Sequence, residues 1–280
     1  MQYELPNGHL SASALNTLLT CPRMYEFKYI DRIPTPPTAS MLTGTALHKT
    51  FEEYYRTAMT STQRYTADQI KELAATSFED TITSEECYVT AEERSAAIST
   101  VKNLAATYVD LVAASITPLA VEEQHVHTAR CGVPLLAYID LRRQYSDGSE
   151  GIIDYKITTR KWTPDKLKNS LQFSLYAMMT GIGDIEVHNL LRAAPANRVA
   201  SAKKSDDMID IAPDLRILRY FFDGGINDHL DNLIESAARL ITSGVFMPCA
   251  LDAWNCTPEW CGYWHLCRGK AQSKTLDLAA

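Results

Sequence analysis

The stretch that decides the fold is EGIIDYKITTRKW, residues 150–162, in which an aspartate and a lysine interrupt an apolar run. The apolar residues predict a buried strand, and strand alternation places Asp154 and Lys156 on the same face. Charged groups are costly to bury unless they are paired or bind a metal ion. By itself the pair is also compatible with an ordinary solvated salt bridge, so its interpretation depends on the residues around it.

A second aspartate, Asp140, lies in the segment AYIDLRR, which predicts the preceding strand. The turn residues Asp147 and Gly148 lie midway between the aspartates, so a hairpin centred on residue 147 places Asp140 opposite Asp154. Cross-strand neighbours have Cβ atoms about 5 Å apart, a distance at which like charges repel. A divalent cation between the carboxylates would remove this repulsion, and Mg²⁺ prefers such oxygen ligands.

Two helical segments carry further candidates for this site. His48 follows Gly44 on a predicted helix, and a histidine ligand shifts the preference of a site towards Mn²⁺. Gly44 is small enough to admit a neighbouring backbone. Gln172 and Tyr176 lie four residues apart, on one face of a helix predicted for residues 164–180. Each of these residues is also compatible with a packing or capping role.

The periodicity of the chain predicts an α/β or α+β fold. Helices are expected over 14–30 with a break at Pro22, and over 41–59, 67–80, 91–115, 164–180 and 213–242; strands are expected over 119–129, 133–145, 150–159 and 184–193. This order predicts a single domain with a mixed central sheet flanked by helices. Its parts are a mainly helical segment 1–117, a sheet-bearing core 118–212, and a long helix with a Cys-rich tail at 213–280.

The composition of the 280-residue chain excludes some classes of protein. The sequence has no apolar run of the 18 or so residues that span a bilayer and no signal peptide, so we expect a cytoplasmic protein with no membrane partner. The net charge of −7 argues against a general polyanion-binding protein. Residues 156–168 and 192–204 nevertheless each carry a net charge of +4. They could line a basic groove, or they could be two solvated loops.

Taken in order, these motifs resemble the PD-(D/E)XK nuclease superfamily, and more closely its RecB-like branch. The similarity extends from residue 13 to residue 267, and one small departure is Ala137, where a glycine is common. The matching pieces are Gly44 with His48, Asp140, the DYK of 154–156, and Gln172 with Tyr176.

The resemblance implies a restriction-endonuclease-like fold and a set of roles for these residues. It implies that Mg²⁺ or Mn²⁺ is held by His48, Asp140, Asp154 and the backbone carbonyl of Tyr155. It also implies catalytic roles for Asp140, Asp154, Lys156, Gln172 and Tyr176. Glu122 or Glu123, on the preceding strand, would add an outer carboxylate.

Cysteines are concentrated near the end of the chain, in WNCTPEWCGYWHLC, residues 254–267. In a chain expected to be cytoplasmic, such cysteines indicate metal ligands more than disulfides. Cys256, Cys261 and Cys267 lie among aromatic residues, which suits a soft-metal centre in an aromatic shell. The spacing leaves zinc open as well, although zinc sites usually have closer pairs. The aromatic residues are Trp254, Trp260, Tyr263 and Trp264.

The same resemblance decides between these metals. Iron–sulfur members of the RecB-like branch include the CRISPR-adaptation nucleases and the AddB nuclease domain, and they take one cysteine from an N-terminal C-P-x-x-Y motif, matched here at Cys21. The resemblance therefore implies a [4Fe–4S] cluster that packs the tail on the N-terminal helix. Its ligands would be Cys21, Cys256, Cys261 and Cys267, with Cys249 as the alternative to Cys256.

The function that the resemblance implies is a metal-dependent DNA exonuclease in phage- or CRISPR-linked recombination or repair. Its substrates would be single-stranded DNA or double-stranded ends, and a recombinase, helicase or single-strand-binding protein would be its partner, in a bacterial or phage-infected cell. The alternative is a catalytically silent DNA-binding or scaffold subunit of a helicase–nuclease or recombination complex. Trp162 and Tyr155 are candidates for stacking on bases, and Trp162 is equally a candidate for a core or capping residue. The basic candidates for DNA binding are Arg160, Lys161, Lys166, Arg192, Lys203 and Lys204.

Overall fold

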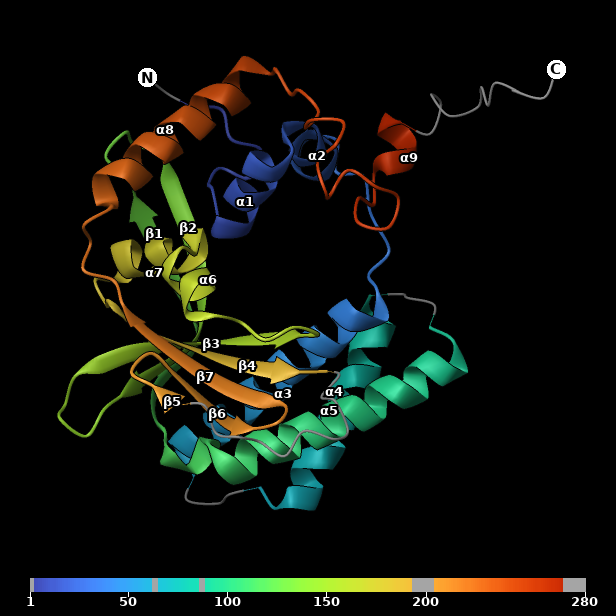
Figure 1. Cartoon of the computed structure of the whole chain (residues 1–280), viewed down its shortest axis with the longest axis vertical. Helices are drawn as coiled ribbons and strands as arrows, with labels where there is room; N and C mark the ends of the chain where they lie inside the picture. Colours follow the sequence, from blue (N-terminus) through green and yellow to red (C-terminus); the bar gives the residue numbers. More distant parts are fainter. Residues whose placement is uncertain (1–2, 62–64, 86–88, 193–203, 269–280) are drawn as a thin grey trace. The chain divides into compact units, whose positions relative to one another are not determined.

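In the computed structural model of the chain, the described residues are 3–61, 65–85, 89–192 and 204–268 (Figure 1). They form two compact units, and we describe each by itself. The second unit contains most of the sheet, and the first contains the cysteines near the end of the chain. The first unit comprises Met1–Pro36, His127–Leu136 and Asp228–Ala280, and the second comprises Pro37–Val126 and Ala137–Asn227.

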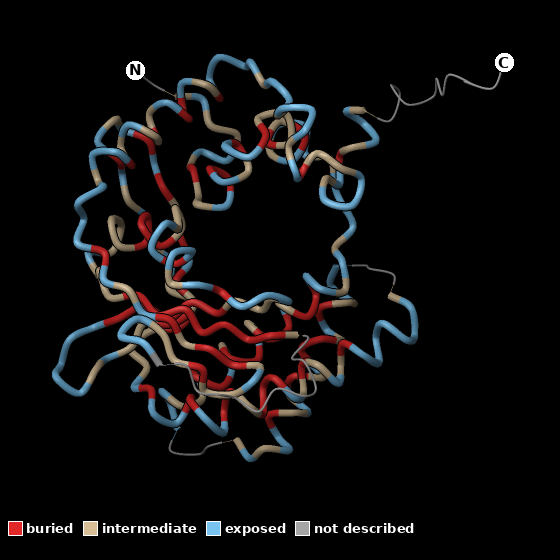
Figure 2. Tube along the Cα trace, in the orientation of Figure 1, coloured by how far each residue is buried: buried red, intermediate tan, exposed pale blue. Residues whose placement is uncertain are grey.

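The second unit is built on a mixed sheet with the strand order β1-β2-β3-β4-β7-β6-β5. Strands β3 and β4 are parallel, whereas β2 with β3, β4 with β7, and β6 with β7 are antiparallel. Figure 2 shows that β3 and β4, in the middle of the sheet, are largely buried. The strands are β1 (Thr117–Thr128), β2 (Pro134–Gln144), β3 (Glu150–Thr158), β4 (Asp184–Leu191), β5 (Lys204–Ser205), β6 (Met208–Ala212) and β7 (Leu215–Phe221).

Helices cover both faces of this sheet, as the predicted fold class requires (Figure 1). Leu141, Ile153 and Tyr155 pack with α3, α4 and α5 on one face, whereas Ile139 and Ile152 pack with α6 and α7 on the other. The helices are α3 (Ala39–Thr60), α4 (Ala67–Ser84), α5 (Ala91–Leu111), η2 (Ala113–Ser115), α6 (Pro164–Lys168) and α7 (Leu171–Thr180). The helix predicted for 164–180 is therefore two helices, because the chain leaves the helical path at residues 169 and 170.

The predicted register of the β2–β3 hairpin is confirmed. Leu141 faces Ile153 and Gln144 faces Glu150, which centres the hairpin on residue 147. Gly148 has a φ of +86°, a backbone conformation that glycine adopts without steric cost. Ile139 and Leu141 pack in different cores, although residues two apart on a regular strand share a face. Strand β2 thus changes its facing at Asp140, at the edge of the regular β2–β3 ladder.

The first unit joins segments from the beginning and the end of the sequence. Cys21 has an extended backbone between α1 and α2, because Pro22 begins a new helix there. The ring of Tyr263 lies 5.6 Å from the ring of Phe27, and its hydroxyl donates to the carbonyl of Ile33 at 3.0 Å. The predicted packing of the tail on the N-terminal helical segment is confirmed. The helices are α1 (Ala12–Thr20), α2 (Pro22–Tyr25), η1 (Glu26–Ile30), α8 (Asn227–Ser243) and α9 (Trp264–Cys267).

The single helix predicted for residues 213–242 is wrong in its first half. Residues 215–221 form strand β7, and α8 begins only at Asn227. The apolar spacing fits a helix or a strand, but Gly224 and Gly225 lie where that helix would have continued. Each glycine costs a helix interior about 1 kcal/mol relative to alanine, so the break between the two elements is favoured. In the described part of the chain, no helix combines the length and apolar character that a membrane span requires.

Candidate active site

His48 projects from α3 towards the strands that carry the two predicted aspartates. Its Nε2 lies 3.1 Å from the carbonyl oxygen of Tyr155, and its Nδ1 lies 3.3 Å from Oδ2 of Asp140. The same Oδ2 accepts the backbone N–H of Tyr155 at 2.9 Å. Asp140 is thus fixed to the backbone of β3 and to α3. The close backbone approach predicted at Gly44 is wrong, because a Cβ there would meet no atom within 4 Å.

A third ligand group comes from Glu122 on β1. The ligand atoms of His48, Glu122 and Asp140 all lie within 4.8 Å of one another, and no other described set of three such residues is so close. Glu122 has a φ of +49°, a left-handed conformation that non-glycine residues rarely adopt and that is often strained where it occurs at functional sites. This backbone conformation places the carboxylate of Glu122 beside the other two groups.

Asp154 and Lys156 form a hydrogen-bonded ring with Gln172. The ammonium of Lys156 lies 2.7 Å from Oδ2 of Asp154 and donates to Oε1 of Gln172 at 3.0 Å. Nε2 of Gln172 donates to Oδ1 of Asp154 at 2.9 Å, which fixes the orientation of the amide. Nε2 also donates to the hydroxyl of Tyr176 at 2.7 Å, and that hydroxyl donates to the carbonyl of Tyr138 at 3.1 Å. Every member of the predicted D-x-K and Q-x-x-x-Y motifs is therefore in contact.

The charged groups of the site shift one another's pKa values. Burial alone would lower the pKa of His48, but the carboxylates of Asp140 and Asp154 outweigh it and raise that pKa to about 9. Although burial opposes it, the charge and hydrogen bond of His48 keep the pKa of Asp140 below its ordinary value. Burial, and then the charge of Asp140, raise the pKa of Glu122 to about 7. At neutral pH, a proton on His48 therefore balances part of the negative charge of the carboxylates.

The donor set fits a hard divalent cation. Two carboxylates, one imidazole and the carbonyl of Tyr155 converge at one place, which is the ligand chemistry of Mg²⁺ or Mn²⁺ sites. Asp154 lies beside this group and is electrostatically coupled to Asp140, but Lys156 and Gln172 bind its oxygens. The structure thus brings three of the four predicted ligands together, namely His48, Asp140 and the Tyr155 carbonyl, and leaves Asp154 beside them. It adds Glu122, which the sequence suggested only as an outer carboxylate.

A buried polar network, which the sequence analysis missed, lies behind the site. The hydroxyl of Tyr108 lies 2.9 Å from Nδ1 of His188 and 3.4 Å from the hydroxyl of Tyr155. Nε2 of His188 lies 2.9 Å from Glu186, which also accepts a hydrogen bond from Arg143 at 3.2 Å. The hydrogen bond of its hydroxyl fixes the Tyr155 ring within this network, and the same ring lies edge-on to the imidazole of His48, with ring centroids 5.8 Å apart.

The two aromatic residues predicted to stack on DNA bases are buried instead. Only 3% of Tyr155 and 7% of Trp162 is exposed. The Tyr155 ring packs against Phe51 and Tyr108, and the Trp162 ring packs against Phe173. The prediction of base stacking is therefore wrong for both residues, because the cores on the two faces of the sheet already enclose their rings.

The structure describes four of the six basic side chains predicted to bind DNA. The ammonium of Lys161 forms an ion pair with Asp210 at 3.0 Å, and Arg192 donates to the hydroxyl of Ser40. Arg160 and Lys166 are exposed. Two predictions lie outside the described residues, namely Lys203 and the side chain of Lys204.

The predicted cluster ligands are brought together in the first unit. One pocket is lined by Cys21, Cys249, Cys256, Cys261 and Cys267. The backbone N–H of Cys249 lies 3.4 Å from Sγ of Cys21. Burial, and then the neighbouring Cys21 and Cys256, raise the pKa of the Cys249 thiol to about 12. The alternative ligand Cys249 therefore lines the same pocket as the predicted ones.

The predicted aromatic shell around these cysteines is only half present. Tyr263 and Trp264 line the pocket. Trp254 and Trp260 are instead 72% and 70% exposed and contact each other edge to face, with ring centroids 5.6 Å apart. The prediction is therefore wrong for these two tryptophans.

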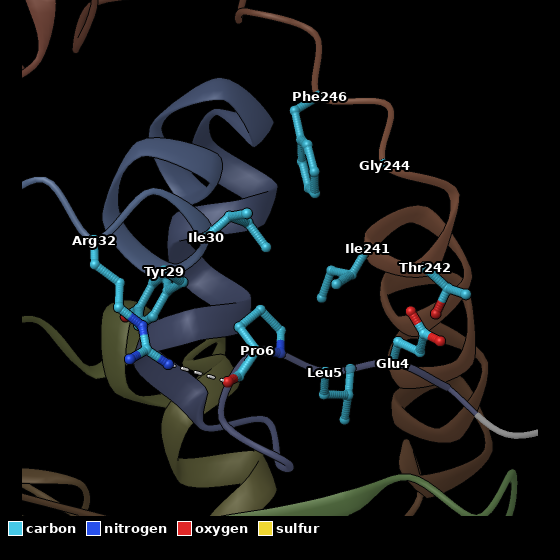
Figure 3. Close-up of a pocket in the computed structure, with 10 residues that line it drawn as sticks. All are labelled: Glu4, Leu5, Pro6, Tyr29, Ile30, Arg32, Ile241, Thr242, Gly244 and Phe246. Atoms are coloured by element: carbon cyan, nitrogen blue, oxygen red, sulfur yellow. Dashed lines mark hydrogen bonds between the residues drawn. The ribbon is translucent and has the colours of Figure 1, made fainter.

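A larger pocket, of about 520 Å³, lies elsewhere in the first unit (Figure 3). The N-terminal segment, η1 and the end of α8 line it, with Tyr29, Ile241 and Phe246 among the apolar residues. Arg32 donates to the carbonyl of Pro6 at its edge. None of the predicted site residues lines this pocket, so its size does not identify the active site.

Comparison with models of protein families identifies the superfamily of the chain. The family model of the PD-(D/E)XK nuclease superfamily matches residues 9–268, and the chain therefore belongs to this superfamily. A comparison with curated proteins gives no significant match. Among solved structures, one described as "Crystal structure of SSO0001" aligns with a TM-score of 0.41 and 12% sequence identity, over 94% of this chain and 87% of that chain.

Proposed function

We propose that the chain is a Mg²⁺- or Mn²⁺-dependent deoxyribonuclease that hydrolyses phosphodiester bonds from DNA ends. The observation that carries the proposal is that two groups of residues meet at the backbone of Tyr155, which contacts His48 and Asp140 and lies between Asp154 and Lys156 in β3. His48, Glu122 and Asp140 form an acidic cation site, and Asp154, coupled to it, holds the ammonium of Lys156. A scaffold protein has no need of such a costly buried arrangement of charges.

The residues of the chain have distinct roles in this proposal. His48, Glu122, Asp140 and the Tyr155 carbonyl hold the divalent cation, which lowers the pKa of water and neutralises charge on a phosphate. Asp154 and Gln172 orient the ammonium of Lys156, and Tyr176 in turn orients Gln172. The oriented ammonium stabilises the negative charge that develops on the phosphate oxygens, without reorganisation during the reaction.

The finer assignment is a cytoplasmic exonuclease of phage- or CRISPR-linked recombination or repair. It acts on single strands or double-stranded ends, together with a recombinase, a helicase or a single-strand-binding protein. The resemblance of the motif set to the RecB-like branch supports this assignment. The competing function is a catalytically silent DNA-binding or scaffold subunit.

One assay separates these functions. The purified chain is incubated with Mg²⁺ or Mn²⁺ and either end-labelled linear DNA or the same DNA as a closed circle. We expect degradation of the linear form alone, and none by Asp154→Ala or Lys156→Ala. Asp68→Ala, at an exposed acidic residue of α4, is the control and should cut as the wild type does. Cutting of the circle would contradict the exonuclease, and DNA binding without any cutting would establish the scaffold.

We also propose that Cys21, Cys256, Cys261 and Cys267 hold a [4Fe–4S] cluster with a structural role. The Cys21–Pro22 motif and the cysteines of the tail, which line one pocket, resemble the ligands of the iron–sulfur members of the RecB-like branch. In such a cluster each thiolate binds a different iron atom.

The cluster proposal has its own readout. Anaerobically purified protein should contain four irons and four sulfides per chain, as element analysis and the visible absorption spectrum would show. Cys21→Ser and Cys261→Ser should lose iron, whereas Cys131→Ser, which does not line the pocket, should keep it. Comparing Cys249→Ser with Cys256→Ser identifies the fourth ligand. Colourless, iron-free protein that is folded and active would refute the proposal.

A further inference from the structure

Lys166 and the active-site Lys156 share an aromatic platform, which consists of the rings of Trp162 and Phe173. The ammonium of Lys156 lies 5.4 Å from the ring centre of Phe173 and 6.0 Å from that of Trp162. The ammonium of Lys166, on α6, lies 4.2 Å from the same Trp162 ring. The ammonium groups of Lys156 and Lys166 are therefore at most about 10 Å apart. Lys166 is exposed, so its charge is open to a ligand.

The platform is held in place by hydrogen bonds as well as by packing. The backbone N–H of Trp162 donates to the side-chain oxygen of Asn189 at 2.8 Å, and its carbonyl accepts from Arg216 at 2.9 Å. The amide nitrogen of Asn189, which is fully buried, donates to the backbone carbonyl of Lys156 at 2.8 Å. The side chain of Asn189 thus links β3, which carries Lys156, to Trp162, whose ring contacts the ammonium of Lys166.

Lys166 differs from Lys156 and Lys161 in the partner that its ammonium has. Lys156 pairs with Asp154 and Lys161 pairs with Asp210, whereas the ammonium of Lys166 lies over an indole ring. An aromatic ring attracts a cation without neutralising its charge. Burial, and then the charge of Lys156, lower the pKa of Lys166, so the two cations are held together at an electrostatic cost that an anion would relieve.

We propose that Lys166, positioned by the Trp162 ring, binds the backbone phosphate of DNA next to the phosphate that Lys156 faces. The proposal rests on the nuclease function and adds to it a second phosphate position with a defined residue. A DNA strand carries one phosphate per roughly 3.4 Å of helix axis. The distances to Trp162 keep the two ammonium groups within about 10 Å of each other, which is close enough for them to face neighbouring phosphates. Trp162 is a positioning residue, because it acts through Lys166.

The test measures how binding depends on salt. All proteins carry Asp154→Asn to prevent cutting, and fluorescence anisotropy gives Kd for a labelled single-stranded oligonucleotide over a series of KCl concentrations. A phosphate contact to a single strand contributes about 0.7 to the slope of log Kd against log salt. We expect Lys166→Gln to lose about that much slope and to bind several-fold more weakly. Lys168→Gln removes the same charge from the same helix, where the ammonium lies over Tyr220, and should change neither quantity as much.

The possible outcomes separate this inference from the function on which it rests. If the Asp154→Asn protein with all lysines intact does not bind DNA, the nuclease proposal itself fails. If it binds but Lys166→Gln keeps the full slope, or matches Lys168→Gln, only the second phosphate position is overturned. Trp162→Leu should weaken binding while it keeps every charge, with thermal unfolding as the check of folding. If Trp162→Leu does not fold, the two lysine variants still decide.

Discussion

Lys156 lies 2.7 Å from Asp154, two residues earlier on the same strand, and the side chain of Asp154 is 2% exposed. Burial raises the pKa of Asp154 to about 6, and the charge of Lys156 opposes this rise. The ammonium therefore has two effects. It keeps a buried carboxylate ionised, and it presents a positive charge at the cation site.

Replacing this lysine should remove catalysis with little change in folding. We expect Lys156→Met to cut at least about 100-fold more slowly, because preorganised donors at developing charge contribute that much or more. The single-turnover rate on end-labelled DNA measures the effect. Lys49→Met is the matched control, since that ammonium contacts only the hydroxyl of Thr81 in the described structure. A variant that retains a tenth of the wild-type rate would exclude Lys156 from the chemistry.

The left-handed backbone of Glu122 gives the second prediction. A non-glycine residue in this conformation costs of order 1–3 kcal/mol, which glycine avoids. We expect Glu122→Gly to unfold at a higher denaturant concentration than Glu122→Gln when no divalent cation is present. Both variants lack the carboxylate, so both should lose most of the stabilisation that Mn²⁺ gives the wild type in thermal unfolding. If Mn²⁺ stabilised Glu122→Gln as much as the wild type, Glu122 would not be a ligand.

Gly44 allows a test of where the substrate approaches. It lies one turn before His48 on α3, and apart from its chain neighbours and the backbone of its own helix, a Cβ there would meet no atom within 4 Å. Alanine at this position should stabilise the helix by about 0.5–1 kcal/mol. We expect Gly44→Ala to raise the midpoint of thermal unfolding and yet to raise KM for DNA, because residues i and i+4 share a face. An unchanged KM would show that DNA does not approach along this turn.

The buried network behind the site predicts a pH dependence of stability. Although burial opposes it, the hydrogen bond and charge of His188, with the charge of Arg143, lower the pKa of Glu186 from 4.5 to about 2. A carboxyl with a depressed pKa stabilises the fold above its unfolded pKa and loses that effect as the pH falls through its folded pKa. The shift corresponds to about 3 kcal/mol.

Glu186→Gln measures this contribution directly. At pH 7 the variant should be less stable than the wild type by about 3 kcal/mol in urea unfolding. The difference should shrink between pH 4.5 and pH 2, because the wild-type carboxylate becomes protonated there. Asp110→Asn, at an exposed residue of α5, is the control. A difference that stayed constant down to pH 2 would mean that packing, and not charge, accounts for the loss of stability.

The parts of the fold that local chemistry determines were predictable from the sequence. The register of the β2–β3 hairpin follows from its turn residues, and the contact between Lys156 and Asp154 follows from strand alternation. The left-handed conformation of Glu122 was not predictable, because nothing in its local sequence requires it. It depends on tertiary packing around β1.

The buried network behind the site and the break between β7 and α8 were missed although the sequence contains a signal for each. Glu186 and His188 interrupt the apolar strand DIEVHNLL with the same spacing as Asp154 and Lys156, so the same reasoning would have found the buried network. The helix expected for 213–242 ignored Gly224 and Gly225, which favour a break between β7 and α8. In both cases the apolar periodicity was given more weight than the residues that interrupt it.

The first unit draws on residues from the beginning of the sequence and on residues after Asp228, whereas the second unit needs nothing beyond Asn227. During synthesis on the ribosome, the sheet with its cation site can assemble before the other cysteines of the Cys21 pocket, which come after Asp228, have been synthesised. This order of synthesis allows the cation site to form before the cysteine pocket closes. If the pocket binds the proposed cluster, a delay in iron delivery would leave a chain with a folded sheet and an incomplete first unit.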